Sequence, residues 1–378
     1  MIVQTPPMGW NTWNTFGEHI NEQLIRESVD TFVKLGLREA GYQYVVIDDC
    51  WSERERDSKT NEIVPSKEKF PNGMKAVGDY IHENGLKFGM YSCAGVRTCA
   101  NYPGSFGHEF LDARTFARWG VDFLKYDYCL KAFSDKAPYL YRRMGQALRT
   151  CGRDILFSAC NWGVEDVWSW IRTTGASMYR STGDIFDNFE SMKNIALGQL
   201  PKMCYSAPNC FNDMDMLTVG MFGNGNVGSS GCSYEEYVMQ FSAWCLWGAP
   251  IMLGCDLRKV TPEIVKLVTN RDLIAINQDP LVAQPYCIEP GAMGSDLVNV
   301  ARILEGGDIA IGLFNFSDND RHTTVLLEWL GLPYESKIRL EMRDLISGES
   351  MMSGRDEFSV RIPRHSVRMF RCKLVPAV

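Results

Sequence analysis

The chain reads Val121-Asp-Phe-Leu-Lys-Tyr-Asp-Tyr128 at the end of its first third, and this stretch sets a pattern for most of the sequence. It is a short, mainly apolar run that ends at Asp127, and an amphipathic stretch at 136–149 follows it. Apolar runs of this kind are typical of parallel strands that are buried on both faces. An amphipathic stretch is typical of a helix that covers such strands. The two together predict one strand–helix unit of an α/β protein.

Seven similar runs lie elsewhere before residue 260, which makes eight. They are 8–13, 42–49, 87–92, 155–160, 178–185, 210–217 and 250–255. Helical patterns are expected beside them at 21–37, 73–84, 109–119, 164–173, 188–200, 234–247 and 261–269. Eight strand–helix units in about 275 residues match the size of a (β/α)8 TIM barrel.

The pattern changes after Asp279-Pro280. Short strand-like stretches separated by turn signals lie at 297–302, 308–316, 323–327, 337–344, 358–362 and 364–373. They predict a second, all-β domain with the architecture of an antiparallel β-sandwich. We place the boundary at about residue 282, so that the barrel spans 1–282 and the sandwich 283–378.

Composition excludes several classes of protein. The 378 residues carry a net charge of −7, which argues against a nucleic-acid partner. No apolar run reaches the roughly 18 residues of a membrane span, and the N-terminus lacks the pattern of a secretion signal. The 13 cysteines and five histidines show no metal-ligand spacing, so we expect no metal and no cofactor.

Active sites of such barrels lie at the carboxyl ends of the strands. These ends are acidic and aromatic here, and the candidate residues are Trp13, Asp48, Asp49, Tyr91, Lys125, Asp127, Asn161, Trp162, Arg180, Asp184, Asp213 and Asp215. Carboxylates accept hydrogen bonds from sugar hydroxyls and aromatic faces stack on a pyranose ring, so the set favours a sugar site. For Asp48 or Asp213 taken singly, a helix-capping role stays open.

Glycoside cleavage needs two carboxyl groups of different character. Asp127 follows Lys125 by two residues, so both side chains point to one side of the strand, where the ammonium would keep the carboxylate ionised. Asp184 follows Arg180 by four and is a candidate proton donor, although spacing alone does not decide which aspartate has which role. An aldolase with Lys125 as its Schiff-base amine and a non-catalytic sugar-binding protein are the alternatives from other classes.

Five motifs, in order along the chain, resemble glycoside hydrolase family 27, which contains α-galactosidases and α-N-acetylgalactosaminidases. They are Met8-Gly-Trp-Asn-Thr-Trp13, Val46-Ile-Asp-Asp-Cys-Trp51, Lys125-Tyr-Asp127, Asn212-Asp-Met-Asp-Met-Leu217 and Ala275-Ile-Asn-Gln-Asp-Pro280. The resemblance implies a barrel followed by a β-sandwich. It also implies a retaining hydrolase that removes terminal α-D-galactose from oligosaccharides or glycoconjugates by double displacement, without a cofactor.

The resemblance also implies a role for each site residue. It makes Asp127 the nucleophile and Asp184 the general acid and base. The implied sugar contacts are Asp48 and Asp49 with the 4- and 6-hydroxyls, Lys125 with the 3- and 4-hydroxyls, Arg180 with the 2-hydroxyl, Trp13 under the ring, and Tyr91 and Asp215 around the pocket. Trp162 is a candidate sugar platform at the rim.

Asn161 departs from the family pattern. Many family α-galactosidases have a glutamate there that binds the 2-hydroxyl, and the α-N-acetylgalactosaminidases have a smaller residue. We expect Asn161 to bond a 2-hydroxyl through its amide. β-L-Arabinopyranose and N-acetylgalactosamine therefore stay open as alternatives to galactose.

The cysteines indicate a compartment. Cys99 and Cys129 match a pair that is bridged beside the nucleophile in secreted family members. Cys50 and Cys160 match half-cystines whose partners are replaced by Glu18 and Ala176. Together with the missing signal, this predicts a cytoplasmic, bacterial-type enzyme, a setting that disfavours the bridge. Family members often form dimers or tetramers, so a homo-oligomer is an open expectation, whereas no membrane partner is expected.

Overall fold

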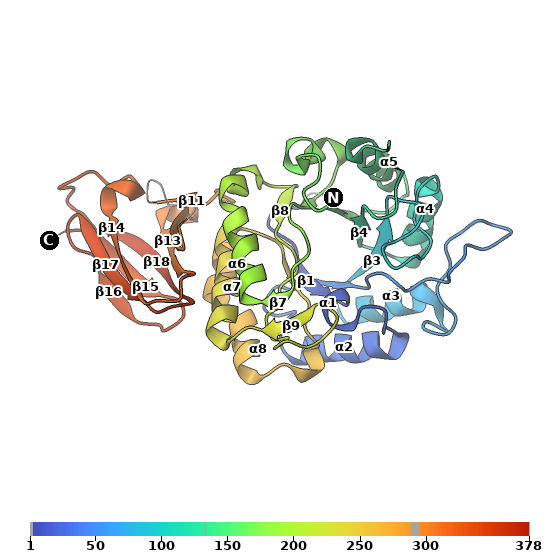
Figure 1. Cartoon of the computed structure of the whole chain (residues 1–378), viewed down its shortest axis with the longest axis horizontal. Helices are drawn as coiled ribbons and strands as arrows, with labels where there is room; N and C mark the ends of the chain where they lie inside the picture. Colours follow the sequence, from blue (N-terminus) through green and yellow to red (C-terminus); the bar gives the residue numbers. More distant parts are fainter. Residues whose placement is uncertain (1–2, 133, 289–294, 378) are drawn as a thin grey trace.

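The computed structural model describes residues 3–132, 134–288 and 295–377. Eight parallel strands form its main sheet, in the order β10-β1-β2-β3-β4-β5-β6-β8 (Figure 1). Their bounds are β1 (Met8–Asn11), β2 (Tyr44–Val46), β3 (Lys87–Cys93), β4 (Phe123–Asp127), β5 (Leu156–Cys160), β6 (Met178–Arg180), β8 (Phe211–Asp213) and β10 (Ile251–Leu253). Every one of them lies within an apolar run of the sequence or extends it by one residue, because strands buried on both faces need apolar side chains throughout.

The sheet closes on itself just beyond β8. The N–H of Leu217 donates to the carbonyl of Met252 at 2.8 Å, and the carbonyl of Leu217 accepts from the N–H of Gly254 at 3.0 Å. These bonds join the chain after β8 to β10 in parallel. The predicted TIM barrel is therefore confirmed.

Helices cover the outside of the barrel. They are α2 (Glu22–Lys34), α3 (Gly73–Glu83), α4 (Glu109–Trp119), α5 (Ala137–Arg149), α6 (Phe189–Gly198), α7 (Tyr234–Trp247), α8 (Pro262–Val268) and α9 (Arg271–Asn277), with a single turn, α1 (Trp13–Phe16), directly after β1. Their ends follow local chemistry. Asn21 caps α2 by accepting from the N–H of Leu24, and Ser233 with Glu236 forms a reciprocal capping box at α7.

One predicted helix is wrong. The stretch 164–173 contains two short 3₁₀ segments, η1 (Val167–Ser169) and η2 (Ile171–Thr174), instead of an α-helix. The backbone is left-handed at Glu165 and Asp166, with φ of 58° and 49°, so a helix cannot start there. The sequence pattern also did not predict α9 or the small parallel pair of β7 (Asp187–Asn188) and β9 (Gly228–Gly231).

The C-terminal part consists of two facing antiparallel sheets. Six strands have the order β11-β12-β13-β18-β15-β16, and β14 pairs with β17. Their bounds are β11 (Tyr286–Cys287), β12 (Leu297–Ile303), β13 (Ile309–Asn315), β14 (Arg321–Leu326), β15 (Ile338–Asp344), β16 (Ser350–Met352), β17 (Glu357–Ile362) and β18 (Ser366–Pro376). Side chains of both sheets, such as Ile311 and Val360, share one apolar core, which confirms the β-sandwich.

The two parts share a second apolar core. Strands β12, β13 and β18 pack against α7, and the ring of Trp247 meets Phe314 edge-on at 4.9 Å. Gly312 lies at this contact, where an added Cβ would come within 2.6 Å of Leu246.

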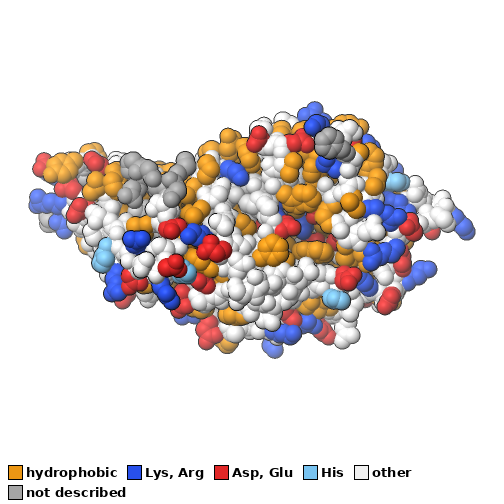
Figure 2. All heavy atoms as spheres, in the orientation of Figure 1, with side chains coloured by type: hydrophobic (Ala, Val, Ile, Leu, Met, Phe, Trp, Pro, Cys, Tyr) orange, Lys and Arg blue, Asp and Glu red, His pale blue; other side chains and the backbone are white. Residues whose placement is uncertain are grey.

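Over the face in Figure 2, charged side chains of both signs are interspersed, and hydrophobic ones gather over the barrel. Among the residues that the structure describes, no helix has the length and apolar character to cross a bilayer.

Candidate active site

A pocket opens at the carboxyl ends of the barrel strands. The residues predicted for the site line this pocket together, except Asn161 and Asp213. The lining side chains are Trp13, Asn14, Asp48, Asp49, Tyr91, Cys99, Lys125, Asp127, Cys160, Trp162, Arg180, Asp184, Ile185, Asp215, Met216 and Val227.

Asp127 ends β4 and is only 7% exposed. Its Oδ1 accepts from the N–H of Tyr128 at 2.9 Å, and its Oδ2 accepts from the hydroxyl of Tyr91 at 3.1 Å. Two fixed donors therefore hold the carboxylate in one orientation. Burial raises the pKa of Asp127 to about 6, although Lys125 acts in the opposite direction. Lys125 thus favours the ionised carboxylate, as the spacing predicts, but the effect of burial on this pKa is larger.

Lys125 instead pairs with Asp48. The Nζ of Lys125 lies 2.9 Å from Oδ2 of Asp48, which also accepts from the side-chain amide of Asn11 at 2.7 Å. Burial opposes the charge on Lys125, but the neighbouring groups, with the Asp48 carboxylate first among them, together outweigh burial and raise the pKa of the lysine. A lysine that stays protonated is a poor amine nucleophile, which disfavours the aldolase alternative. Asp48 does not cap a helix, so the capping alternative fails for it.

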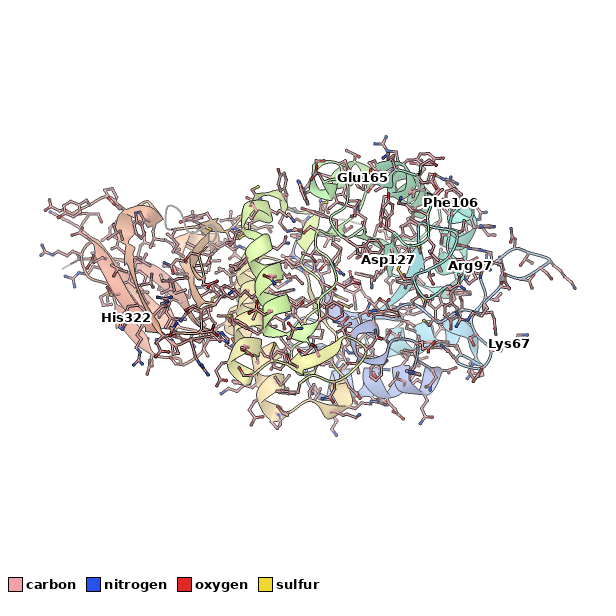
Figure 3. The ribbon with its side chains drawn as sticks, in the orientation of Figure 1. Lys67, Arg97, Phe106, Asp127, Glu165 and His322 are labelled. Carbon is pink, nitrogen blue, oxygen red and sulfur yellow. A yellow bond between two sulfur atoms is a disulfide. The ribbon has the colours of Figure 1, made fainter. Side chains whose placement is uncertain are left out.

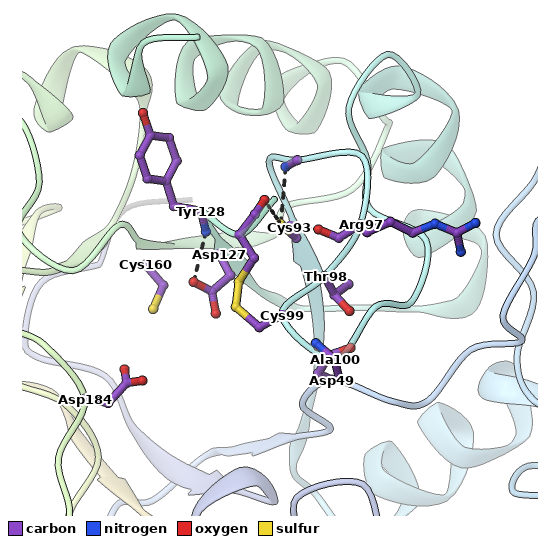
Figure 4. The surroundings of a disulfide bond; sticks show 12 residues. Asp49, Cys93, Arg97, Thr98, Cys99, Ala100, Asp127, Tyr128, Cys160 and Asp184 are labelled. Carbon is purple, nitrogen blue, oxygen red and sulfur yellow. Dashed lines mark hydrogen bonds between the residues drawn. A yellow bond between two sulfur atoms is a disulfide. The ribbon is translucent and has the colours of Figure 1, made fainter. Parts of the chain in front are cut away.

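Asp49 is held by the loop that follows β3. Its Oδ2 accepts from the N–H of Ala100 at 3.2 Å, and its Oδ1 accepts from the N–H of Cys50 at 2.7 Å. Burial raises its pKa, and a hydrogen bond from the Thr98 side chain lowers it. Cys99, between Thr98 and Ala100, forms a disulfide with Cys129, with a Cα–Cα distance of 5.1 Å (Figure 4). The bridge ties this loop to the end of β4, two residues beyond Asp127.

Arg180, at the end of β6, contacts two carboxylates. Its Nη2 lies 2.5 Å from Oδ1 of Asp184, and its Nη1 lies 2.7 Å from Oδ1 of Asp215. Burial raises the pKa of Asp215 to about 6 while Arg180 opposes the shift. Asp127 lies inside the barrel part of the molecule (Figure 3). The side chain of Asp184 is 66% exposed at the pocket, on the opposite side from Asp127 (Figure 4). Of the two catalytic candidates, Asp127 is thus buried and Asp184 is exposed.

The structure does not bring Asn161 to the pocket. Its side chain is fully buried, and its Nδ2 donates to the carbonyl of Val164 at 2.9 Å. The sulfur of Cys160 and the ring of Trp162 line the pocket on either side of it in the sequence. The expected amide contact with a 2-hydroxyl is therefore absent from this geometry.

Several lining residues were missed. Val227 reaches the pocket from a glycine-rich loop that carries no sequence signal for a sugar site, and its N–H donates to the carbonyl of Asn14 at 3.0 Å.

Asp213 lies beneath the pocket and accepts from the N–H of Asp215 at 2.9 Å, so it does not cap a helix. Among the described residues, Cys99, Cys129 and Asp127 come closest to a metal-ligand group, but the two sulfurs are joined to each other.

A polar, aromatic-walled pocket that holds several carboxylates at the mouth of a barrel is the kind of site that glycoside hydrolases use. Residues 5–279 match the family model described as alpha galactosidase A, and residues 295–372 match the alpha galactosidase C-terminal beta sandwich domain. The chain belongs to this α-galactosidase family, glycoside hydrolase family 27, and is a galactose-removing glycoside hydrolase.

Known relatives support the assignment over the whole chain. The α-galactosidase of Cyamopsis tetragonoloba is 43% identical over 372 residues, which cover 98% of this chain and 86% of the relative. The crystal structure of α-galactosidase I from Mortierella vinacea superposes with a TM-score of 0.89 at 31% identity, covering 98% and 97% of the two chains. The α-galactosidase of Saccharomyces cerevisiae, solved with raffinose, has a TM-score of 0.86 at 26% identity, with 98% of each chain covered.

Proposed function

We propose that this pocket hydrolyses terminal α-D-galactosides by double displacement, with Asp127 as the nucleophile and Asp184 as the general acid and base. The observation that carries the proposal is the orientation of Asp127. Two donors fix its carboxylate inside the pocket, while Asp184 lies exposed on the opposite side. A buried, oriented carboxylate suits attack on carbon, and an exposed one suits proton exchange with a leaving group and with water.

The first step forms a glycosyl ester. Oδ2 or Oδ1 of Asp127 attacks the anomeric carbon as the bond to the leaving oxygen breaks, and protonated Asp184 gives its proton to that oxygen. Asp184 is then ionised. In the second step it takes a proton from water, whose oxygen attacks the anomeric carbon and releases Asp127 as a carboxylate. Two inversions leave the product as the α-anomer.

The sugar contacts are proposed from the same geometry. Asp48 and Asp49 are buried acceptors for the 4- and 6-hydroxyls, and Lys125 donates to the 3- and 4-hydroxyls. Because Lys125 and Asp48 already pair at 2.9 Å, they present a donor and an acceptor side by side. Trp13 and Trp162 form aromatic walls, and Tyr91 and Asp215 complete the site.

The 2-position is the point at which the alternatives differ. Arg180 is the proposed donor to the 2-hydroxyl, and its Nη1 lies 3.9 Å from the sulfur of Cys160. With Asn161 turned away, the sulfur and the Trp162 ring occupy this side of the pocket. We propose that they leave room for a hydroxyl but not for an acetamide, so that galactose is preferred over N-acetylgalactosamine.

The natural substrate is proposed to be a small galactose-containing oligosaccharide. The yeast relative was solved with raffinose, which supports this class.

A cytoplasmic, bacterial-type setting and a homo-oligomer remain proposals. The Cys99–Cys129 bridge opposes the first. Alkylation of the protein before and after reduction, followed by mass spectrometry, would give the state of the two thiols in cells.

The proposed function is tested by following the first-formed product. Proton NMR of fresh hydrolysis of an aryl α-D-galactoside should show α-galactose before it equilibrates with the β-anomer. Aryl β-L-arabinopyranoside and aryl α-N-acetylgalactosaminide, run in parallel, should be poorer substrates. Initial appearance of β-galactose would overturn the double displacement, and a clear preference for either competing glycoside would overturn the assignment of the sugar.

A further inference from the structure

The loop 162–166, which follows β5, has a left-handed backbone conformation that residues other than glycine rarely adopt. The φ angles of Trp162, Glu165 and Asp166 are 57°, 58° and 49°, and that of Gly163 is 81°. Residues other than glycine are uncommon in this region, so tertiary contacts must hold the loop in place. Trp162 lines the pocket, whereas Glu165 and Asp166 are exposed. Whatever fixes this loop also fixes one wall of the sugar site.

Glu165 connects the loop to β4. Its Oε1 accepts from the hydroxyl of Tyr128 at 3.0 Å and from the N–H of Ala137 at 3.4 Å. Its backbone carbonyl accepts from the indole N–H of Trp170 at 2.7 Å. The ring of Tyr128 also meets the Trp162 ring edge-on, with 6.3 Å between centroids. Trp162, which lines the pocket, and the carboxylate of Glu165 thus both contact Tyr128.

Tyr128 reaches the nucleophile at its other end. Its N–H donates to Oδ1 of Asp127, while its ring extends away from that carboxylate (Figure 4). The tyrosine is 4% exposed, and its single hydroxyl hydrogen is shared between Glu165 and the carbonyl of Asp135, which lies 3.2 Å from the hydroxyl oxygen. When Glu165 is removed, this hydrogen bonds Asp135 alone and keeps Tyr128 in place. A loss of Glu165 therefore acts on the loop and leaves the support of Asp127 intact.

We propose that Glu165 and Tyr128 are a positioning pair that sets the distance between the Trp162 wall and Asp127, and so sets the affinity for the sugar. This rests on the proposed function of the same pocket. Neither side chain lines the pocket, so both act through Trp162. Because the pair shapes the wall and not the reacting carboxylates, it affects sugar binding more than the chemical step.

The test compares Glu165→Ala with the parent. KM for an aryl α-galactoside and Ki for free galactose should both rise about fivefold, the value of one ordinary hydrogen bond, while kcat stays within about twofold. Glu165→Gln keeps an oxygen acceptor for the Tyr128 hydroxyl and should restore most of the affinity. Asp166→Ala is the matched control, because it removes the neighbouring carboxylate at a left-handed position and leaves the Tyr128 bond in place.

A double-mutant cycle shows whether the two residues act together. Tyr128→Phe should raise KM as Glu165→Ala does, and the double variant should be no worse than either single one. If the two single substitutions raised KM independently, so that their effects multiplied in the double variant, the proposal would be overturned. A fall in kcat at unchanged KM would overturn it as well. A folded parent without turnover would overturn the proposed function instead. Calorimetric titration with galactose would then decide on the pair, and an unchanged Kd in Glu165→Ala would refute it.

Discussion

Arg180 and Asp215 form a buried ion pair, with 2.7 Å between Nη1 and Oδ1 and both side chains only 4% exposed. Asp215 also accepts from the N–H groups of Ile185 and Met216, at 2.8 Å and 2.7 Å. The other terminal nitrogen of Arg180 contacts Asp184. The buried Asp215 therefore positions the exposed Asp184 in two ways. It holds Arg180, which contacts Asp184, and it binds the backbone N–H of Ile185, the residue after Asp184.

Removing Asp215 should damage both stability and turnover. Asp215→Ala leaves the Arg180 charge buried with one of its two carboxylates missing, and loss of one partner of a buried pair costs about 3 kcal/mol or more. Urea unfolding measures the loss, and Lys75→Ala, at an exposed ion pair with Asp79, is the comparison. A loss below about 1 kcal/mol in Asp215→Ala, the range of surface pairs, would contradict the positioning role.

The acid side of the pH profile should follow Asp127. Burial raises its pKa to about 6, and a nucleophile must be ionised to attack. We therefore expect kcat/KM on an aryl α-galactoside to fall as the pH drops through about 6. Asp215 has a pKa raised to a similar value, so the apparent pKa belongs to coupled groups. A profile that stays flat down to pH 4 would contradict this expectation.

The same shift predicts a stability change of defined sign. The pKa of Asp127 is raised from 3.8 in an unfolded chain to about 6, so its contribution to folding is fully present below pH 4 and is lost as the pH rises through 6. Asp127→Asn removes the ionised form. It should gain about 1–3 kcal/mol in the free energy of unfolding at pH 7.5 and little at pH 4. Urea unfolding at both pH values measures this, and a variant less stable at pH 7.5 would refute it.

Asn161 should prove structural. Its Nδ2 bond to Val164 contributes about 1 kcal/mol, so Asn161→Ala should lower stability by that amount. The ratio of activities on the galactoside, the arabinopyranoside and the N-acetylgalactosaminide should not change. Trp162→Ala, which opens the pocket wall itself, should change the ratio. An altered ratio in Asn161→Ala would restore the direct contact that its position in the sequence had suggested.

The predictability of the site depends on the strands. Lys125 and Asp127 point to one side because strand residues alternate, and the structure places both in the pocket. Because Cys160 points into the pocket, the same alternation points Asn161 away from it. The expected contact of Asn161 with the sugar rested on the family resemblance and did not take this alternation into account. The loop 162–166 could not be predicted, because its left-handed backbone depends on a contact between Glu165 and Tyr128, which lies 37 residues earlier in the sequence. The pKa of Asp127 likewise depends on burial, which local spacing does not reveal.

The most direct test of the account is release of nitrophenol from p-nitrophenyl α-D-galactoside by the parent chain and by Asp127→Asn, with circular dichroism to show that both are folded. The account predicts steady release by the parent and a loss of at least about 10⁴-fold in the variant, the scale on which removal of a catalytic nucleophile acts. Comparable release by both proteins would contradict the role of Asp127. No release by the folded parent would contradict the α-galactosidase activity itself.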